Sequence, residues 1–169
     1  MTKSKLCYFA PFLFFFLMLI DAHLTQNLMA FSQDRYIWRA HLVLIAMLFA
    51  VKYLSKNYMI LIALAIGSLF DLYYLGLIGV YAVTFPVTIW LMYLLYGILF
   101  QNDFNLFFGM IICVTFFEIL IVSIQLIFNL ISIDLIYFVT QLLAPTLLLN
   151  MGLYLISLYP FKKIFWKNK

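Results

Sequence analysis

The sequence predicts an all-α integral membrane protein, a class supported by its composition, its apolar runs and the placement of its basic residues. The chain of 169 residues is 68% hydrophobic and only 9% charged. A soluble domain is nearer half apolar and about a quarter charged, so this chain lacks the polar residues for an ordinary water-exposed surface. We therefore expect most of its surface to face lipid.

Six apolar runs are interpreted as membrane spans, and together they occupy nearly the whole chain. A membrane-spanning helix needs about 20 apolar residues, so six of them take roughly 120 positions and leave short loops. We predict a single membrane domain over residues 1–169, with spans at about 6–28, 37–54, 58–75, 78–100, 106–130 and 135–159. The first run follows two lysines as a signal peptide would, but no small-x-small cleavage site follows it, and we expect an uncleaved helix.

The basic residues predict that both termini lie in the cytoplasm. Positive charge is enriched in the cytoplasmic loops of membrane proteins. With the N-terminus inside, only Arg35 and Arg39 lie outside, and eight lysines lie on the cytoplasmic side: Lys3, Lys5, Lys52, Lys56, Lys162, Lys163, Lys167 and Lys169. Trp38 and Trp166 fall near opposite interfaces, where their rings would anchor the protein. We predict a multi-pass protein of the plasma membrane whose basic residues meet anionic lipid rather than nucleic acid.

Three carboxylates fall within the predicted spans, namely Asp21, Asp71 and Glu118. An ionisable side chain in hydrocarbon costs roughly 2.5–3.5 kcal/mol on insertion scales, so each should face protein or water. At 1.5 Å per residue, the two aspartates lie about 20 Å from the cytoplasmic start of their helices. We place all three in the central-to-outer half of the bilayer.

The third span carries a glycine–aspartate motif. Ala63, Gly67 and Asp71 follow one another at four-residue spacing, so the carboxylate shares a helix face with small residues that allow close helix contact. Asp71 should therefore point into a helix interface, just before a glycine-rich bend that includes Gly79. We predict that Gly67, Asp71 and Gly79 form a structural motif that maintains a shape for partner docking.

A second group of polar residues predicts a seam inside the bundle. Thr115, Glu118 and Gln125 lie along one stripe of the fifth span, and we group Asp21 and Gln141 with them. These side chains either join helices through hydrogen bonds or line an outward-opening pocket or a docking groove for a partner helix.

Catalytic, cofactor and metal motifs are missing from the sequence. His23 and His41 have no partner at ligand spacing, and we expect an interfacial and a packing role. Walker, dinucleotide-binding and zinc patterns are absent, and the serines have no basic companion at a fixed spacing. We predict no catalytic, cofactor or metal site, which leaves an intramembrane enzyme little support.

The segment Gly67-x3-Asp71-Leu-x6-Gly79-Val, followed by a long apolar helix, resembles the core signature of the MreD family of bacterial rod shape-determining membrane proteins. Four further features agree: the chain length, the Asp21-x-His23 segment that ends the first span, the acidic residue of the fifth span, and Ala144-Pro145-Thr146 with Asn150 in the sixth. The likeness covers essentially the whole chain and is greatest to streptococcal forms. Tyr73-Tyr74 departs from the small polar residues common after this aspartate in the family.

The resemblance implies a non-enzymatic scaffold of the cell-elongation and peptidoglycan synthesis machinery. Its implied partners are an MreC-like single-span protein, and also RodA and a class B penicillin-binding protein. The family is similar in fold to the six-helix S-components of energy-coupling-factor transporters. That similarity supplies the alternative function, a small-molecule-binding subunit of a vitamin transporter in which Asp71, Glu118 and Gln141 line an outer-facing pocket.

Overall fold

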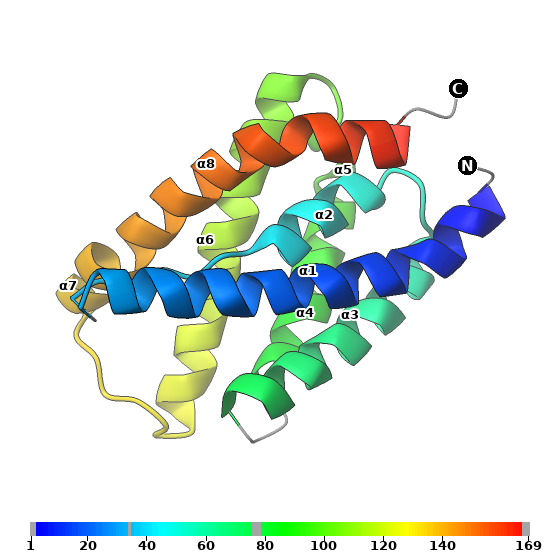
Figure 1. Ribbon diagram of the computed structural model, residues 1–169. Coiled ribbons are helices and arrows are strands. Elements are labelled where there is room, and N and C mark those ends of the chain that lie inside the picture. The colour runs from blue at the N-terminus through cyan, green and yellow to red at the C-terminus, as the bar shows by residue number, and fades with distance from the viewer. Residues whose placement is uncertain (1–2, 34, 76–78, 167–169) are drawn as a thin grey trace.

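The computed structural model describes residues 3–33, 35–75 and 79–166, and these residues form helices and connecting segments without a strand (Figure 1). The prediction of an all-α protein is therefore confirmed for the described part of the chain. In Figure 1 the blue start of α1 and the red end of η3 lie on the same side of the molecule. An even number of membrane crossings would place them so.

The helices follow the predicted apolar runs. The elements in chain order are α1 (Lys3–Phe31), α2 (Leu42–Ala50), α3 (Lys56–Phe70), η1 (Asp71–Leu75), α4 (Val80–Leu94), α5 (Tyr96–Leu99), α6 (Asp103–Ile127), α7 (Leu135–Tyr137), η2 (Phe138–Leu143), α8 (Ala144–Phe161) and η3 (Lys162–Trp166). The η elements are wider π-helical turns. Two of them extend α3 and α8, and η2 leads into α8.

Four helical segments are long and apolar enough to cross a membrane: Tyr8–Phe31, Lys56–Tyr73, Asp103–Ile127 and Leu135–Phe165. A fifth apolar helix, α4, is shorter at 15 residues. Residue 78, where the fourth span was predicted to begin, and two of the tail lysines lie outside the described residues. Six crossings and the cytoplasmic placement of the termini stay predictions.

The predicted second span, 37–54, is not one continuous helix. Its helical part, α2, has nine residues, which is about 14 Å of rise against a hydrocarbon core of about 30 Å. Residues 37–41 before it have no helical structure, and His41, directly before α2, has φ −130° and ψ 46°. The apolar composition of this stretch did not predict that its first five residues are non-helical. Their backbone is instead bound by side chains of α1 and α8.

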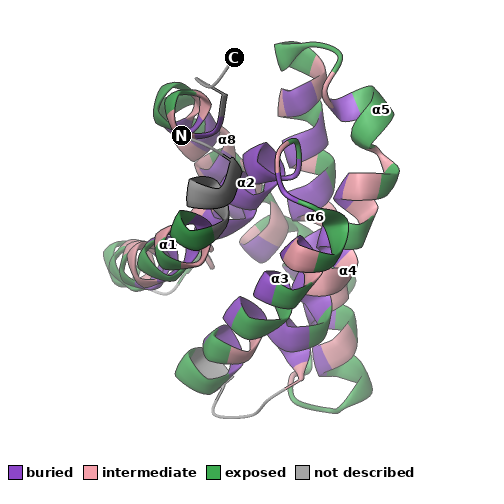
Figure 2. Cartoon of the chain, turned by 90° about the vertical axis from the view of Figure 1, so that its right-hand side faces the viewer, coloured by how far each residue is buried: buried purple, intermediate pink, exposed green. Residues whose placement is uncertain are grey.

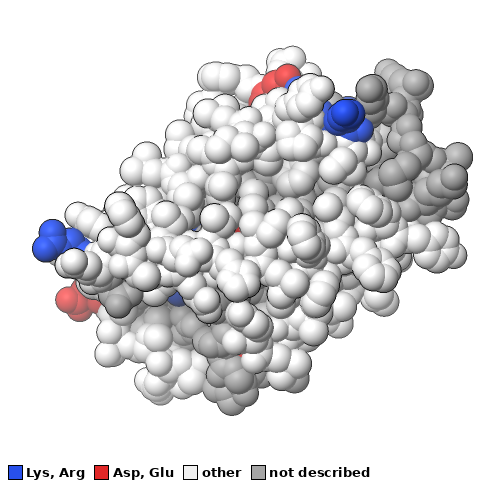
Figure 3. All heavy atoms as spheres, in the orientation of Figure 1, with Lys and Arg blue, Asp and Glu red and all other residues white. Residues whose placement is uncertain are grey.

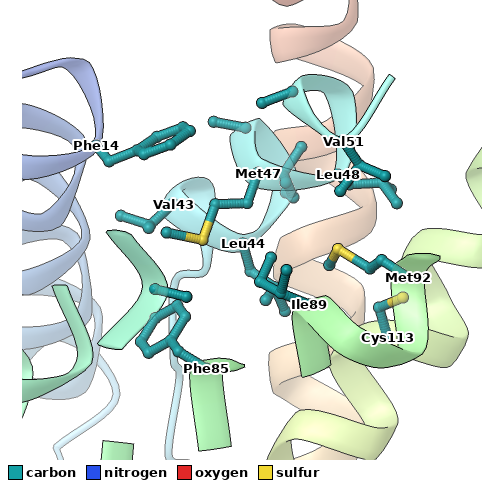
Figure 4. Close-up of a cluster of buried hydrophobic side chains, with 14 of the residues drawn as sticks. Phe14, Val43, Leu44, Met47, Leu48, Val51, Phe85, Ile89, Met92 and Cys113 are labelled. Carbon is teal, nitrogen blue, oxygen red and sulfur yellow. The ribbon is translucent and has the colours of Figure 1, made fainter. Parts of the chain in front are cut away.

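The core is built around α2. Every residue from Val43 to Ala50 is at most 1% exposed, so this helix is buried on all sides. An all-round apolar helix of this kind belongs inside a bundle. It contacts α1, α4, α6, α8 and η3. Figure 4 shows Leu44 and Met47 of α2 among Phe14, Ile89 and other side chains of the neighbouring helices.

The outward faces of the long helices are apolar. Figure 2 shows exposed residues on the outer side of α1 and α3, while α2 is buried inside. Phe12 is 78% exposed on α1 and Leu61 is 66% exposed on α3. On the face in Figure 3, charged atoms lie mainly at the margins and the broad middle is uncharged. Such an apolar surface suits lipid, because in water it would favour aggregation.

Candidate functional site

Asp71 caps the beginning of the neighbouring helix α4. Its carboxylate is fully buried and accepts hydrogen bonds from the backbone N–H groups of Gly79 (2.8 Å), Tyr81 (2.7 Å) and Ala82 (2.9 Å). The first N–H groups of a helix have no partner within the helix, and the helix dipole favours a negative charge there. Asp71 therefore joins the end of α3 to the start of α4, which confirms that it points into a helix interface.

The two glycines of the motif allow this junction. A Cβ atom on Gly67 would lie 2.4 Å from the carbonyl oxygen of Tyr81, closer than real contacts allow, so α3 and α4 can approach only if this residue is glycine. Gly79 has a φ of 145°, a conformation that L side chains rarely adopt. The predicted motif is thus one continuous contact between two helices. Whether it also serves partner docking stays a prediction.

Asp21 caps α2 in the same manner. Its carboxylate is 1% exposed and accepts hydrogen bonds from the N–H groups of Leu42 (2.8 Å) and Val43 (2.9 Å). One turn further along α1, the hydroxyl of Thr25 accepts a hydrogen bond from the N–H of Ala40 (3.0 Å). The i, i+4 pair on α1 therefore binds both the helix start and the non-helical residue before it.

Side chains of α8 bind the other edge of segment 37–41. Asn150 accepts a hydrogen bond from the N–H of His41 (2.8 Å) and donates to the carbonyl of Arg39 (2.8 Å). Thr146 accepts from the N–H of Arg39 (3.3 Å) and donates to the carbonyl of Ile37 (3.2 Å). Non-helical backbone at membrane depth requires such protein partners, because lipid offers none.

We expect Asn150→Leu to lower the melting temperature of the detergent-purified protein by roughly 4–12 °C. Leucine matches the size of asparagine but leaves the His41 N–H and the Arg39 carbonyl unpaired, at about 1–3 kcal/mol per buried group. Thermal unfolding followed by size-exclusion chromatography measures the shift. The control is Asn105→Leu, which removes an exposed amide on α6 and should change little; equal losses in both variants would contradict the assigned role.

Glu118 is the centre of a buried charge cluster. It is fully buried on α6 and accepts hydrogen bonds from the guanidinium of Arg39 (2.8 Å) and from Nε2 of His41 (2.7 Å). The His41 ring also packs edge-on against Phe117, with centroids 5.2 Å apart. A carboxylate that is paired and hydrogen-bonded in this way is tolerated inside the membrane.

This cluster shows two partners of Glu118 that the sequence did not reveal. Arg39 was predicted only to lie on the outer side, and the structure adds that its side chain is 20% exposed and paired with Glu118. His41 was predicted to have a packing role, and it packs against Phe117 but also binds the same carboxylate. Spacing offered no signal, because Arg39 and Glu118 are 79 residues apart. The sequence could predict only that Glu118 needs a partner, because an acidic side chain within the membrane is costly without one.

A cavity of about 360 Å³ lies beside the cluster, between α1, the segment before α2, α3, α4 and α6. Its lining residues are Thr25, Gln26, Met29, Ile37, Arg39, Ala40, His41, Phe70, Tyr81, Phe85, Phe117 and Gln125. Thr25 to Met29 lie near the end of α1, Phe70 ends α3, and Tyr81 lies near the start of α4. These ends are the outer ones in the predicted orientation, and in that orientation the cavity would lie in the outer half of the membrane.

The residues predicted to form one polar seam lie in several places. Glu118 holds Arg39 at the cavity, and Gln125 lines it, whereas Asp21 is engaged with α2. Thr115 is half-buried on α6. Gln141 lies on η2, where its backbone carbonyl accepts a hydrogen bond from the N–H of Ile37 (2.8 Å). Among the described residues, no cluster of three or more His, Cys, Asp or Glu side chains could hold a metal ion.

Comparison with known proteins identifies the family. The family model described as the rod shape-determining protein MreD matches residues 5–169, nearly the whole chain. Comparisons with curated proteins and with solved structures find no match, so the likeness to transporter S-components stays a prediction. The match agrees with a chain that carries four apolar helices able to span a membrane. The chain therefore belongs to the MreD family of multi-pass membrane proteins that determine rod shape.

Proposed function

We propose that the protein is a non-enzymatic membrane scaffold of the cell-elongation machinery that binds an MreC-like single-span protein. The observation that carries this proposal is the use of the three intramembrane carboxylates. Asp21 and Asp71 cap neighbouring helices, and Glu118 binds Arg39 and His41. All three thus fix the arrangement of helices, which is what a scaffold requires of its buried polar groups.

The α3–α4 contact is the part of this arrangement to which we assign partner docking. Asp71 and Gly79 fix where α4 begins, and Gly67 fixes how closely α4 approaches α3. A partner helix in lipid is held by close packing of complementary surfaces rather than by a hydrophobic force. A small shift of one helix against the other therefore weakens docking. RodA and a class B penicillin-binding protein would join the same assembly through or beside the MreC-like partner.

We expect Gly67→Ala to reduce recovery of a co-expressed, tagged MreC-like protein several-fold, while the variant still inserts into the membrane. The added methyl group overlaps the backbone of Tyr81, so α4 must move outward at a cost of about 1–3 kcal/mol. The measurement is the amount of partner that co-purifies per unit of scaffold in mild detergent.

Gly152→Ala is the matched control, because a Cβ atom at that position on α8 meets no other atom within 4 Å. It should leave recovery of the partner unchanged. The docking assignment fails if Gly67→Ala, well expressed and monodisperse, recovers the partner as fully as Gly152→Ala does.

The alternative function is a vitamin-transporter subunit. The cavity favours it, but two of the residues predicted to line its ligand pocket, Asp71 and Gln141, do not line this cavity. Asp71 is fully engaged with α4, and Gln141 lies on η2. Family membership in turn favours shape determination. Co-purification of transporter ATPases, in place of an MreC-like protein, would support the alternative.

A further inference from the structure

The cavity beside Arg39 is not used by the scaffold function. Its volume of about 360 Å³ lies within the roughly 300–1,000 Å³ typical of small-molecule sites. Four aromatic side chains form much of its wall, namely Phe70, Tyr81, Phe85 and Phe117. They contact one another, with ring centroids 4.7 Å apart for Phe85 and Phe117 and 5.5 Å apart for Phe70 and Tyr81. Such walls favour a flat ring, which packs against them in offset or edge-on geometry.

Gln125 lines the same cavity and carries a side-chain oxygen that has no hydrogen-bond partner among the described residues. The residue is 5% exposed. Buried polar side-chain atoms are nearly always paired, so an unpaired amide on a residue that lines a cavity points to a ligand that supplies the partner. Gln26, which is exposed on α1, marks where this cavity reaches the surface.

The charge of the wall selects among ligands. Arg39 is the one charged residue among those lining the cavity, and its partner Glu118 is fully buried and does not line it. An entering ligand therefore meets the guanidinium before the carboxylate. A carboxylate group gains a charge-assisted hydrogen bond from arginine, whereas a cation is repelled.

We propose that this cavity binds a small planar organic anion, an aromatic carboxylate. Its ring would lie among the four aromatic side chains, its carboxylate would face Arg39, and a polar substituent would bind Gln125. In the predicted orientation the ligand enters from the outer face of the membrane, past Gln26. This proposal does not depend on the partner-docking assignment, because none of Gly67, Asp71 and Gly79 lines the cavity.

The test uses the full chain in lipid nanodiscs and three matched probes. 4-Hydroxybenzoate carries the ring, the carboxylate and a polar substituent, 4-hydroxybenzamide replaces the carboxylate by a neutral amide, and tyramine carries a cation. At a hundredfold excess over its Kd, 4-hydroxybenzoate should raise the melting temperature on the order of 5–10 °C. The other two should have little effect. Benzoate and indole-3-carboxylate extend the set of carboxylates.

Two substitutions locate the site. Gln125→Leu should weaken binding of 4-hydroxybenzoate about tenfold, as expected for one lost hydrogen bond to a buried group. Gln125→Glu should abolish it, because a second carboxylate would then face the ligand. The matched control is Gln141→Leu, which removes another buried amide oxygen that has no partner among the described residues, at a place outside the cavity. It should bind like the parent protein.

Several results would overturn the proposal. It is wrong if none of the three carboxylates binds, if the amide or tyramine binds equally well, or if Gln125→Leu and Gln141→Leu lose the same affinity. It is also wrong if an MreC-like partner, but none of the probes, protects a Gln125→Cys variant from a thiol reagent. The cavity would then receive a protein segment rather than a small molecule.

Discussion

Replacing Glu118 with methionine is expected to lower the melting temperature by roughly 6–20 °C, the largest effect expected of any single substitution in this chain. The change leaves the Arg39 guanidinium and the His41 ring without their shared acceptor in a membrane interior. Breaking a buried ion pair by removing one partner costs about 3–5 kcal/mol, and a kilocalorie corresponds to about 2–4 °C for a chain of this size. Thermal unfolding of the detergent-purified protein, followed by fluorescence-detected size exclusion, measures the loss.

A double variant separates the charge imbalance from the loss of packing. Arg39→Met together with Glu118→Met removes both charges and should recover much of the stability lost in the single variant, because hydrophobic replacement of a buried pair is often neutral. Thr115→Val, about one turn away on α6, serves as a control for substitution in this helix. If the two substitutions instead add, the ion pair is not what holds α6 to the segment before α2.

Replacing Asp71 with leucine is expected to lower the melting temperature on the order of 10 °C. Three N–H groups at the start of α4 lose their acceptor at once, and neither water nor lipid replaces it, since the carboxylate is fully buried. Asp71→Asn should cost about half as much, because the amide keeps one accepting oxygen and loses the charge that favours the helix start. The same unfolding assay ranks the two variants.

Asp103→Asn is the matched control for charge removal. This carboxylate is 63% exposed and pairs with Lys162 at the surface, where an ion pair contributes little. Its melting temperature should match that of the parent protein within error. Equal stability of Asp71→Leu and Asp103→Asn would contradict the capping role assigned to Asp71.

Local sequence pattern was enough to place the glycine–aspartate motif. Four-residue spacing puts Gly67 and Asp71 on one face of a helix in any fold, and a carboxylate on a small-residue face in lipid must meet another helix. The structure confirmed this and identified the partner as the start of α4. For the second span the same pattern failed, because hydropathy measures the preference for lipid and says nothing about hydrogen bonds from distant side chains.

By itself, the sequence determined the all-helical membrane class, the α3–α4 motif and that the three carboxylates turn away from lipid, since each depends on composition or on neighbours along one helix. Only the tertiary structure decided that 37–41 is non-helical, that Glu118 pairs with Arg39 and His41, and that Gln125 faces a cavity. The physical reason is the distance between the partners in the chain: Asn150 is 109 residues from His41, and Glu118 is 79 from Arg39. No periodicity links such positions, and they meet only when the bundle closes.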